Sequence, residues 1–454
     1  MPTVTTVPGV YIEEDASPAM SVSAGATAVP LFVARFSPFK PELEGVITRI
    51  GSWLDYTTLF DSNMPSSVTV NVTSTEGTSA AAKKGLKKAS SGTSEATTPN
   101  NYQIEDIEVV DHSASVSLKL YFQNGGGPCY LYPLANKADE AKLDALPGQI
   151  DEVGQITLLA CPDPDEEYRT AVYGALAGSL GEHKGYFLLA DSAEGDAPDT
   201  VTDSAHVAVY YPNVMISYTR MLDDEHITIV GYNGVTDETG VTLATLRNTN
   251  SVFADEIDKA LADKRSTTLS LTPSALIAGV YNKTDGERGV WKAPANVVLN
   301  GVSDVSVRVT NEQQAFLNPK GINVIRYFSG RGLVVWGSRT QKNDDDWRYI
   351  PVRRLFDAAE RDIKKALLPM VFEPNSQPTW KRVQAAIDNY LYLIWQQGAL
   401  AGNKAEEAYF VRVGKSITMT QDDINQGKMI IQVGMAAVRP AEFIILKFTQ
   451  DMSQ

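Results

Sequence analysis

The sequence predicts a multidomain fold that mixes helices and strands, of the α+β or mixed α/β type. Three observations lead to this fold class. The chain has 454 residues, which is too long for one ordinary hydrophobic core. Between about residues 116 and 300, short apolar runs alternate with segments of helical periodicity. Near the C-terminus, two amphipathic helices are followed by three further strand-like runs.

The first sixty residues predict an extended arm, a strand and a short helix. Residues 4–14 alternate in polarity, but a Pro-Gly pair interrupts them, so they suit an arm better than a central strand. Residues 26–36 form an apolar run of strand length. Residues 52–60 suit a helix in which Ser52 is the N-cap.

Residues 62–101 are rich in Ser, Thr, Ala and Gly and contain a group of four lysines. This composition predicts a surface insertion with a flexible middle. One alternative remains open. Residues 68–72 and 102–110 could instead pair as a small β-module on the outside of the protein.

The middle of the chain shows strands separated by a helix. Residues 166–182 have apolar positions at helical spacing. The predicted strands around this helix are 155–161, 185–190, 205–211 and 214–218.

The last third predicts two strands, two helices and three strands. The strands are expected at 323–328, 332–337, 409–413, 429–435 and 442–448. An amphipathic helix is expected over 352–368, ended by Pro369, and a second over 379–395. The run that starts at Phe443 is apolar on both faces, which is typical of a strand paired on both sides.

Residue types that carry chemistry do not gather in the sequence. None of the four histidines lies at metal-ligand spacing from another His or Cys. The run Asp344–Asp346 could hold a divalent ion, but a solvated turn explains it better. Cys129 and Cys161 lie in apolar settings and are expected to be buried thiols. We therefore expect no catalytic residues, no metal and no cofactor, and a protein that is not an enzyme.

Charge and hydropathy narrow the classes of partner. The net charge of −15 argues against nucleic acid, whose phosphates require clustered Lys and Arg. The first residues lack the basic and apolar regions of a signal peptide, and no run of about 18 apolar residues occurs. We therefore expect a protein that is made and kept in the cytoplasm, with no membrane partner.

Six phrases of the sequence occur in a recognisable order. They are PGVYIEE at 8–14, NGGGPCY at 124–130, AGVYNKTDGERGVWKAPAN at 278–296, LNPKGINVIR at 317–326, GRGLVVWGSRT at 330–340, and most of 347–448. Together they resemble the contractile tail sheath proteins of phages, R-type bacteriocins and related injection machines. Only about 60–112 has no counterpart in that pattern, so it is expected to be a lineage-specific insertion. The total length and this insertion resemble sheaths of extracellular particles of the antifeeding-prophage or Photorhabdus virulence cassette type.

The resemblance implies a structural sheath subunit. Such subunits stack as hexameric rings around an inner tube and contract to drive the tube through a target envelope without nucleotide hydrolysis. The implied partners are copies of the chain, the inner tube protein, baseplate and terminal cap proteins, and other sheath variants, within a particle that is released from the cell. Two alternatives remain: the sheath of a phage tail or R-type bacteriocin, and a tail-associated hydrolase, for which the sequence offers no nucleophile and base.

The resemblance also implies a domain plan for this tail-sheath fold. An N-terminal arm would cover 1–25, and an outer part would cover 26–310 with the insertion at 61–112. An inner domain facing the tube would cover 311–440, and a C-terminal arm 441–454.

Two sets of site residues follow from this plan. The arms would add strands to neighbouring subunits, although each arm could instead pair within its own chain. The arm residues are Val4, Val7, Val10, Tyr11, Ile12, Phe443, Ile444, Ile445, Leu446 and Phe448. The helix over 352–368 would face the tube through weak charge pairs, or else present an ordinary solvated face with pairs such as Glu360–Lys364. Its residues are Arg353, Arg354, Asp357, Glu360, Arg361, Lys364 and Lys365.

Overall fold

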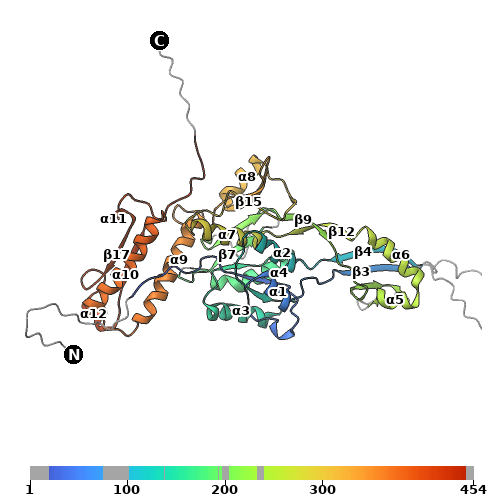
Figure 1. Ribbon diagram of the computed structural model, residues 1–454, viewed down its shortest axis with the longest axis horizontal. Coiled ribbons are helices and arrows are strands. Elements are labelled where there is room, and N and C mark those ends of the chain that lie inside the picture. Colours follow the sequence, from blue (N-terminus) through green and yellow to red (C-terminus); the bar gives the residue numbers. More distant parts are fainter. Residues whose placement is uncertain are drawn as a thin grey trace, which may run out of the picture.

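The computed structural model describes residues 20–74, 102–137, 139–181, 183–192, 194–196, 204–232 and 240–445. Figure 1 shows a long molecule with a sheet-containing central domain in the middle. A small outer module with α5 and α6 lies at one end, and a domain with α9 and α10 lies at the other. The mixture of helices and strands expected from the sequence is confirmed.

A nine-stranded sheet forms the central domain. Its order is β13-β16-β15-β8-β7-β6-β1-β5-β2. The strands are β1 (Pro30–Ala34), β2 (Thr48–Ile50), β5 (Cys129–Pro133), β6 (Leu158–Ala160), β7 (Phe187–Asp191), β8 (Val207–Tyr211), β13 (Val297–Val298), β15 (Ile322–Phe328) and β16 (Gly332–Trp336). The six inner strands from β15 to β5 are parallel, and antiparallel strands close both ends. β1, β5, β6 and β7 are buried at every position, as expected when helices cover both faces of a sheet.

Successive residues of β1 enter two different cores. Phe32 packs with residues of α1 (Trp53–Leu59), α2 (Ser113–Gln123) and α7 (Ser274–Arg288). Leu31 packs with residues of α3 (Glu140–Val153) and α4 (Glu166–Leu176). This alternation follows from the period of two along a strand, so the two helix sets cover opposite faces.

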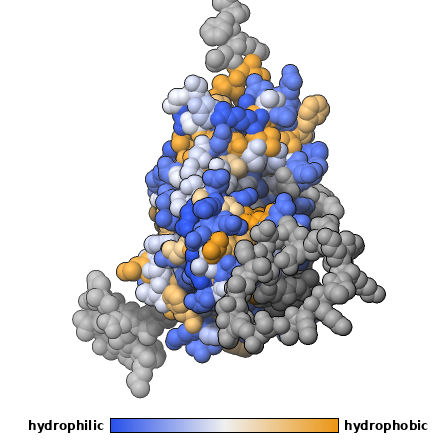
Figure 2. All heavy atoms as spheres, turned by 90° about the vertical axis from the view of Figure 1, so that its right-hand side faces the viewer, coloured by the Kyte–Doolittle hydropathy of each residue, from blue (hydrophilic) through white to orange (hydrophobic). Residues whose placement is uncertain are grey.

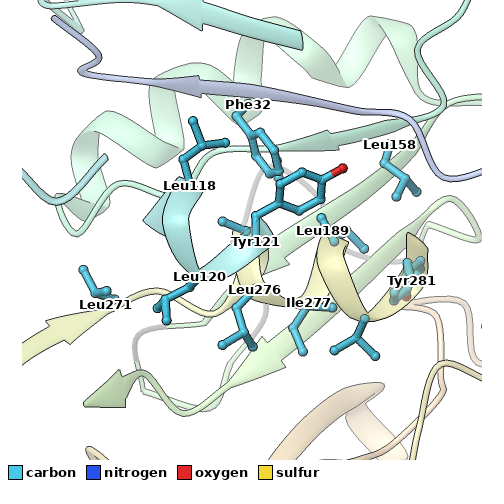
Figure 3. Packing of buried hydrophobic residues seen from close by; sticks show 14 of the residues in the cluster. Phe32, Leu118, Leu120, Tyr121, Leu158, Leu189, Leu271, Leu276, Ile277 and Tyr281 are labelled. Atoms are coloured by element: carbon cyan, nitrogen blue, oxygen red, sulfur yellow. The ribbon is translucent and has the colours of Figure 1, made fainter. Parts of the chain in front are cut away.

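The close approach of α2 and α7 requires a glycine. A Cβ atom at Gly279 would lie 2.5 Å from the backbone oxygen of Tyr121, so a larger residue would push the helices apart. Around this crossing, the Tyr121 ring meets the edge of Phe32 at a centroid distance of 5.0 Å, with Leu276 and Ile277 beside it (Figure 3).

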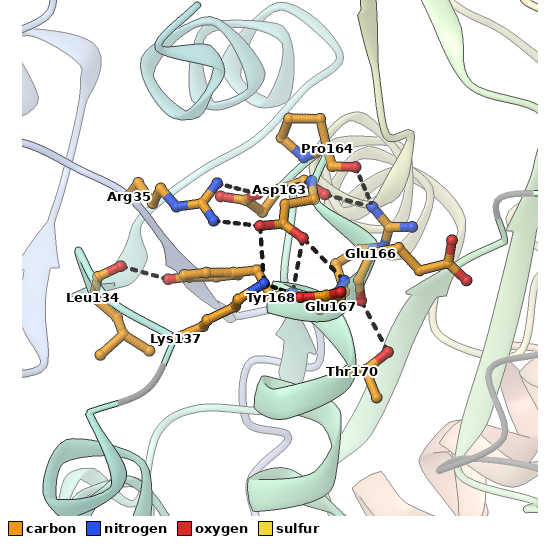
Figure 4. A network of polar contacts seen from close by, with 11 residues as sticks. Arg35, Leu134, Lys137, Asp163, Pro164, Glu166, Glu167, Tyr168 and Thr170 are labelled. Carbon is orange, nitrogen blue, oxygen red and sulfur yellow. Dashed lines mark hydrogen bonds and ion pairs between the residues drawn. The ribbon is translucent and has the colours of Figure 1, made fainter. Parts of the chain in front are cut away.

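A polar network fixes the start of α4 beside the end of β1. Asp165 caps the helix by accepting from the backbone N–H groups of Glu167 and Tyr168. Arg35 donates to Asp163 and Asp165, both at 2.8 Å, and its guanidinium lies 4.4 Å from the Tyr168 ring centroid (Figure 4). The sequence-predicted start of this helix is confirmed.

The outer module is built from two distant parts of the chain. Its four-stranded sheet has the order β11-β10-β3-β4. The elements are β3 (Ser67–Ser74), β4 (Tyr102–Val110), β10 (Ile227–Val230), β11 (Val241–Thr242), α5 (Leu243–Thr249) and α6 (Ser251–Ala262). The β-module that was open as an alternative therefore exists, and the segment from β10 to α6 completes its core. On the face in Figure 2, described hydrophilic and hydrophobic residues are intermixed. A three-stranded sheet of β12 (Ser266–Leu271), β9 (Val214–Thr219) and β14 (Asp304–Val305) is also present.

The C-terminal domain confirms both predicted long helices to within two residues. Its elements are α9 (Ile350–Leu367), α10 (Gln377–Gln396), α11 (Ala405–Ala408), β17 (Tyr409–Val413), α12 (Gln421–Asn425) and β18 (Ile431–Met435). A short helix, α8 (Asn311–Leu317), precedes β15 in the central domain. β17 and β18 form a separate two-stranded sheet.

The structure corrects one boundary of the expected domain plan, and the strand-adding role of the arms stays a prediction. A boundary after residue 310 would cut the central domain, because β15 pairs with β8 and β16 pairs with β15. Within 20–25, Val22 is only 8% exposed and packs against α10, so this part of the N-terminal arm is already attached. Residues 441–445 form no strand, since a strand needs a partner, and the remainder of 442–448 lies outside the described residues.

Candidate assembly surfaces

Arg353 is buried in the first turns of α9. Its side chain is 4% exposed, and its guanidinium lies 4.1 Å from the ring centroid of Trp347. It bonds Asp357 Oδ1, with Nη2 at 2.8 Å and Nε at 3.0 Å, and reaches Glu360 Oε1 at 3.3 Å. Across the junction, Nε2 of the buried His206 lies 3.4 Å from Asp357 Oδ1. Trp347, Asp357 and Glu360 thus surround the guanidinium, and Asp357 also makes the contact with the central domain.

Arg354 makes a second buried junction. Its Nη2 and Nη1 donate to the two oxygens of Asp285 in α7, at 2.6 and 3.0 Å, and Nη2 also donates to the Thr27 carbonyl at 3.0 Å. The guanidinium lies 4.6 Å from the Tyr281 ring centroid. Burial opposes the charge, but the pairing with Asp285 outweighs it and raises the pKa of Arg354. α9 is therefore bonded to α7 and to the residues before β1.

These contacts correct the tube-facing set predicted from the sequence. Arg353, Arg354 and Asp357 are 3–4% exposed, so they bond within the chain and are not open to a partner. Helical spacing shows which residues share a face of the helix. It cannot show that a carboxylate of a distant element, such as Asp285, lies against that face. One feature of the sequence could have indicated their burial: both arginines are adjacent to the apolar stripe of the helix.

The second half of α9 is more open. Lys364 and Lys365 are exposed, and Glu360 and Arg361 are partly exposed. Glu360 Oε2 lies 3.1 Å from Nδ1 of His183, and Arg361 donates to the backbone carbonyls of Gly185 and Ala26, both at 3.3 Å. Burial lowers the pKa of Arg361. Lys364 and Lys365 face the outside, and within the described part of the subunit neither side chain makes a hydrogen bond or an ion pair.

The root of the N-terminal arm is attached to α9 and α10. Asp362 accepts from the Gly25 N–H at 3.1 Å and from the Tyr390 hydroxyl at 3.0 Å. Burial raises the pKa of the Asp362 carboxyl. Met20 and Val22 pack in the same apolar cluster as α10. The sequence-predicted arm residues Val4, Val7, Val10, Tyr11 and Ile12 lie outside the described residues.

A cleft and two strand edges lie close to these roots. The cleft has a volume of about 900 Å³, with α9 on one side and residues 183–186 on the other. Its apolar lining includes Ile363 and Leu367 of α9 and Val433 and Met435 of β18. Within the described part of the chain, the β17–β18 sheet has no third strand. Such open edges can pair with an extended segment.

The C-terminal segment exposes a continuous apolar run. Phe443, Ile444 and Ile445 are 71%, 80% and 80% exposed. Adjacent exposed residues of this size are typical of a surface that another chain covers. Leu446 and Phe448, the other two predicted arm residues, lie outside the described residues.

The other candidate sites have structural explanations. Among the described residues, no group of three His, Cys, Asp or Glu side chains could hold a metal ion. Asp344 accepts from the backbone N–H groups of Asp346 and Trp347, which is the solvated turn that was favoured. Cys129 and Cys161 are free and buried, as expected, and burial raises the pKa of both thiols. No helix in the described ranges is long and apolar enough to span a bilayer.

Family models match both large parts of the chain. Residues 155–341 match the phage tail sheath protein central domain, and residues 342–451 match the phage tail sheath C-terminal domain. The division at 341/342 leaves β15 and β16 within the central domain, as the sheet requires.

Two relatives match over shorter stretches. The chain is 30% identical over 128 residues to the tail sheath protein of Vibrio phage KVP40, which covers 27% of this chain and 19% of the relative. It is 26% identical over 136 residues to a putative prophage major tail sheath protein of Pseudomonas aeruginosa, covering 29% and 35%. The matches thus span only about a fifth and a third of those two proteins.

Solved structures match over nearly the full length. A chain from the baseplate of the anti-feeding prophage is 68% identical, with a TM-score of 0.72, and the match covers 99% of this chain and 100% of that chain. A chain from the contracted helical sheath of the anti-feeding prophage is 67% identical, with the same coverage and a TM-score of 0.73. A chain from the contracted PVC sheath complex, an extracellular contractile injection system, is 37% identical, with a TM-score of 0.65 and 99% coverage of each chain. The chain therefore belongs to the phage tail sheath protein family, as a sheath subunit of the contractile injection system type.

Proposed function

We propose that this chain polymerises as stacked hexameric rings around an inner tube and contracts to drive that tube through a target envelope. The observation that carries this proposal is the full-length match, at 67% identity, to a chain of a contracted helical sheath. A second match, to a chain of a six-fold symmetrised baseplate, supports attachment of the first rings to a baseplate. The inner tube protein, the terminal cap protein and other sheath variants complete the proposed partners.

The subunit moves largely as one body during this change. Arg354 joins α9 to the central domain through a buried charge pair with Asp285, and Asp357 of α9 lies 3.4 Å from His206 of the central domain. Breaking such a pair by separating its partners leaves uncompensated buried charges, which costs about 3–5 kcal/mol. Contraction is therefore cheaper when the contacts between subunits change and these junctions stay closed.

Extended arms supply the links that survive this motion. An arm that adds a strand to a neighbour is held by backbone hydrogen bonds, which tolerate a change of angle at the arm's root. The open edges of the β17–β18 sheet and the exposed run Phe443–Ile445 support this assignment. The other arm residues are Val4, Val7, Val10, Tyr11, Ile12, Leu446 and Phe448.

The contact with the tube runs through the open half of α9. Lys364 and Lys365 are its proposed centre, with Glu360 and Arg361 beside them. Exposed charge pairs contribute only about 0–1 kcal/mol each, so such a contact can be released when the sheath widens.

No catalysis is needed in this role. The energy lies in the extended lattice, which is a metastable state behind a kinetic barrier. The particle assembles in the bacterial cytoplasm and acts after release. The sheath of a phage tail or R-type bacteriocin is not favoured, because the full-length matches are to injection-system chains. A tail-associated hydrolase is not favoured either, because the matched family consists of structural sheath proteins.

Co-expression with the tube and baseplate proteins tests the proposal. Negative-stain microscopy should show sheathed tubes, and a chemical trigger of contraction should convert them to shorter, wider sheaths with protruding tubes. Naked tubes on baseplates, with this chain remaining monomeric in the supernatant, would refute the proposed role.

A further inference from the structure

Glu442 is held by three parts of the subunit at once. Arg339 donates to it from Nη2 at 2.7 Å to Oε2 and from Nε at 3.0 Å to Oε1. Asn318 Nδ2 donates to Oε1 at 2.8 Å, and the Tyr349 hydroxyl donates to Oε2 at 3.2 Å. Its side chain is 21% exposed and that of Arg339 is 13% exposed. No other residue of the segment 439–445 has a comparable set of contacts among the described residues.

Two of the three partners of Glu442, Asn318 and Arg339, belong to a different domain from the chain that leads to it. Just before it, Ala436 and Val438 exchange backbone hydrogen bonds with Ala401 and Ala399 in the C-terminal domain. Asn318 follows α8 and Arg339 follows β16, so both belong to the central domain. The chain therefore crosses from one domain to the other between Val438 and Glu442.

The residues after Glu442 are the exposed apolar run of the C-terminal segment. Phe443 follows it directly and is 71% exposed. A polar clamp immediately before an uncovered apolar run fixes where that run begins and in which direction it leaves the body. The Arg339 guanidinium is itself fixed, because its Nη1 donates to the carbonyl of Asn318 at 3.2 Å. The anchor point is thus pre-organised on the central domain.

The ionised state of Glu442 suits a permanent contact. Burial alone would raise the pKa of the Glu442 carboxyl, but the bonds from Arg339, Asn318 and Tyr349 outweigh it and hold the pKa below its ordinary value. Glu442 therefore stays ionised and paired at neutral pH.

We propose that Glu442 anchors the root of the C-terminal arm to the central domain, so that the apolar residues beyond it are presented in one direction to a second copy of this chain. This proposal rests on the proposed function, in which that arm links subunits. It adds a mechanical consequence. A pull on the arm is received by Arg339 and Asn318 of the central domain before it reaches the β17–β18 hairpin.

A distance measurement on the isolated subunit tests the anchor. Spin labels at Glu312→Cys on α8 and at Ile445→Cys in the arm report how the arm leaves the body. Both native cysteines are buried, so the labels select the introduced thiols. The labelled protein should give a narrow distance distribution, and the added change Glu442→Gln should broaden it. Distributions of equal width in the two proteins would overturn the anchor.

Matched variants separate the anchor from general effects of charge. Glu373→Gln makes the same chemical change at an exposed glutamate and should leave the distribution narrow. Arg339→Gln should broaden it as Glu442→Gln does. The exchange Arg339→Glu with Glu442→Arg should narrow it again, because the pair is restored with opposite polarity. A broad distribution in the Glu373→Gln control would also count against the proposal.

Sheath yield with the tube and baseplate proteins tests the purpose of the anchor. Glu442→Gln should reduce the pelleted sheath roughly tenfold, because a charged hydrogen-bonded contact is weakened at every link. Its thermal melt should stay close to that of Glu373→Gln, which shows that folding is not the cause. A broadened arm with full sheath yield would overturn the proposal. Failure of the unmodified chain to form any sheath would instead refute the proposed function, while the distance measurement would still decide the anchor.

Discussion

Arg354 and Asp285 form a buried, bidentate ion pair that joins α9 to α7, with Nη2 2.6 Å from Oδ2 and Nη1 3.0 Å from Oδ1. The side chains are 3% and 5% exposed. Removal of either partner would leave the other charge buried and without water. The intact pair is therefore strongly favoured, and it holds the two domains together.

Replacing Arg354 should therefore destabilise the subunit strongly. Arg354→Met leaves the Asp285 carboxylate buried without its cation, and we expect a loss of about 3–5 kcal/mol in the free energy of unfolding. Urea unfolding followed by tryptophan fluorescence measures it. Arg288→Met, the same change at an exposed site of α7, should cost within about 0.5 kcal/mol. Equal losses in the two variants would show that the pair contributes nothing specific.

Asp191 should make the stability of the central domain depend on pH. Burial raises the pKa of its carboxyl from 3.8 to about 6, and among the described residues Oδ2 has no hydrogen-bond partner. A raised folded-state pKa adds stability that is fully present below the unfolded pKa and is lost as the pH rises through the folded pKa.

The substitution Asp191→Asn removes this titration. The unmodified chain loses stability as the pH rises from about 4 to about 7, and the variant lacks this loss. The free energy of unfolding of the variant, minus that of the unmodified chain, should therefore increase by roughly 2–3 kcal/mol over this pH range. Paired urea titrations at the two pH values measure the difference. A difference that does not change with pH would mean that Asp191 titrates alike in the folded and unfolded states.

The exposed lysines of α9 should govern attachment of the tube. Arg361 is unsuitable for this test, because it also bonds two carbonyls of its own chain. Lys364→Glu with Lys365→Glu should weaken tube attachment by reversing the local charge, while each surface change costs within about 0.5 kcal/mol of stability. Microscopy should show empty or prematurely contracted sheaths.

Two controls accompany the reversed lysines. Lys292→Glu with Lys381→Glu changes the net charge equally at exposed sites elsewhere and should leave sheaths filled. High salt should mimic the α9 variant in part, because exposed charges are screened over about 8 Å at physiological ionic strength and over less above it. Filled, extended sheaths from the α9 variant would remove the lysines from the tube contact.

Deleting residues 1–15 should leave the fold intact and abolish the sheath. The packed part of the N-terminal segment includes Met20, Val22 and Gly25, all of which the deletion retains. The truncated chain should melt at the temperature of the full chain and remain unassembled beside naked tubes. Contractile particles of normal length would show that this segment does not link subunits.

The insertion should tolerate a deletion only between its two strands. Ser74 of β3 pairs with Tyr102 of β4, so a short turn can replace residues 75–101. That deletion should preserve folding, assembly and contraction. Deleting 62–101 instead removes Val68, Val70 and Val72 from the module's core and should cost several kcal/mol, at about 1.5–3 kcal/mol for each buried side chain. Thermal melts that rank the two deletions in the opposite order would contradict this.

Local patterns in the sequence determined most individual elements of this protein. Ser52 caps the predicted helix at Trp53–Leu59, and the helices over 352–368 and 379–395 were predictable because apolar spacing is a property of adjacent turns. The ordered phrases that resemble tail sheaths indicated the family, which the comparisons confirm.

The partners of these elements were decided only by the tertiary structure. β10 pairs with β3, and β15 with β8, across long stretches of chain that carry no pairing signal. From the sequence alone, Arg354 is interpreted as a surface cation on a helix, because only the folded chain places Asp285 opposite it. Glu442 reads as one more charge in a tail until it meets Arg339. Hydrophobic periodicity depends on residues that are close together in the sequence. A buried ion pair forms only where the folded chain brings together two charges that are far apart in the sequence and excludes water from them.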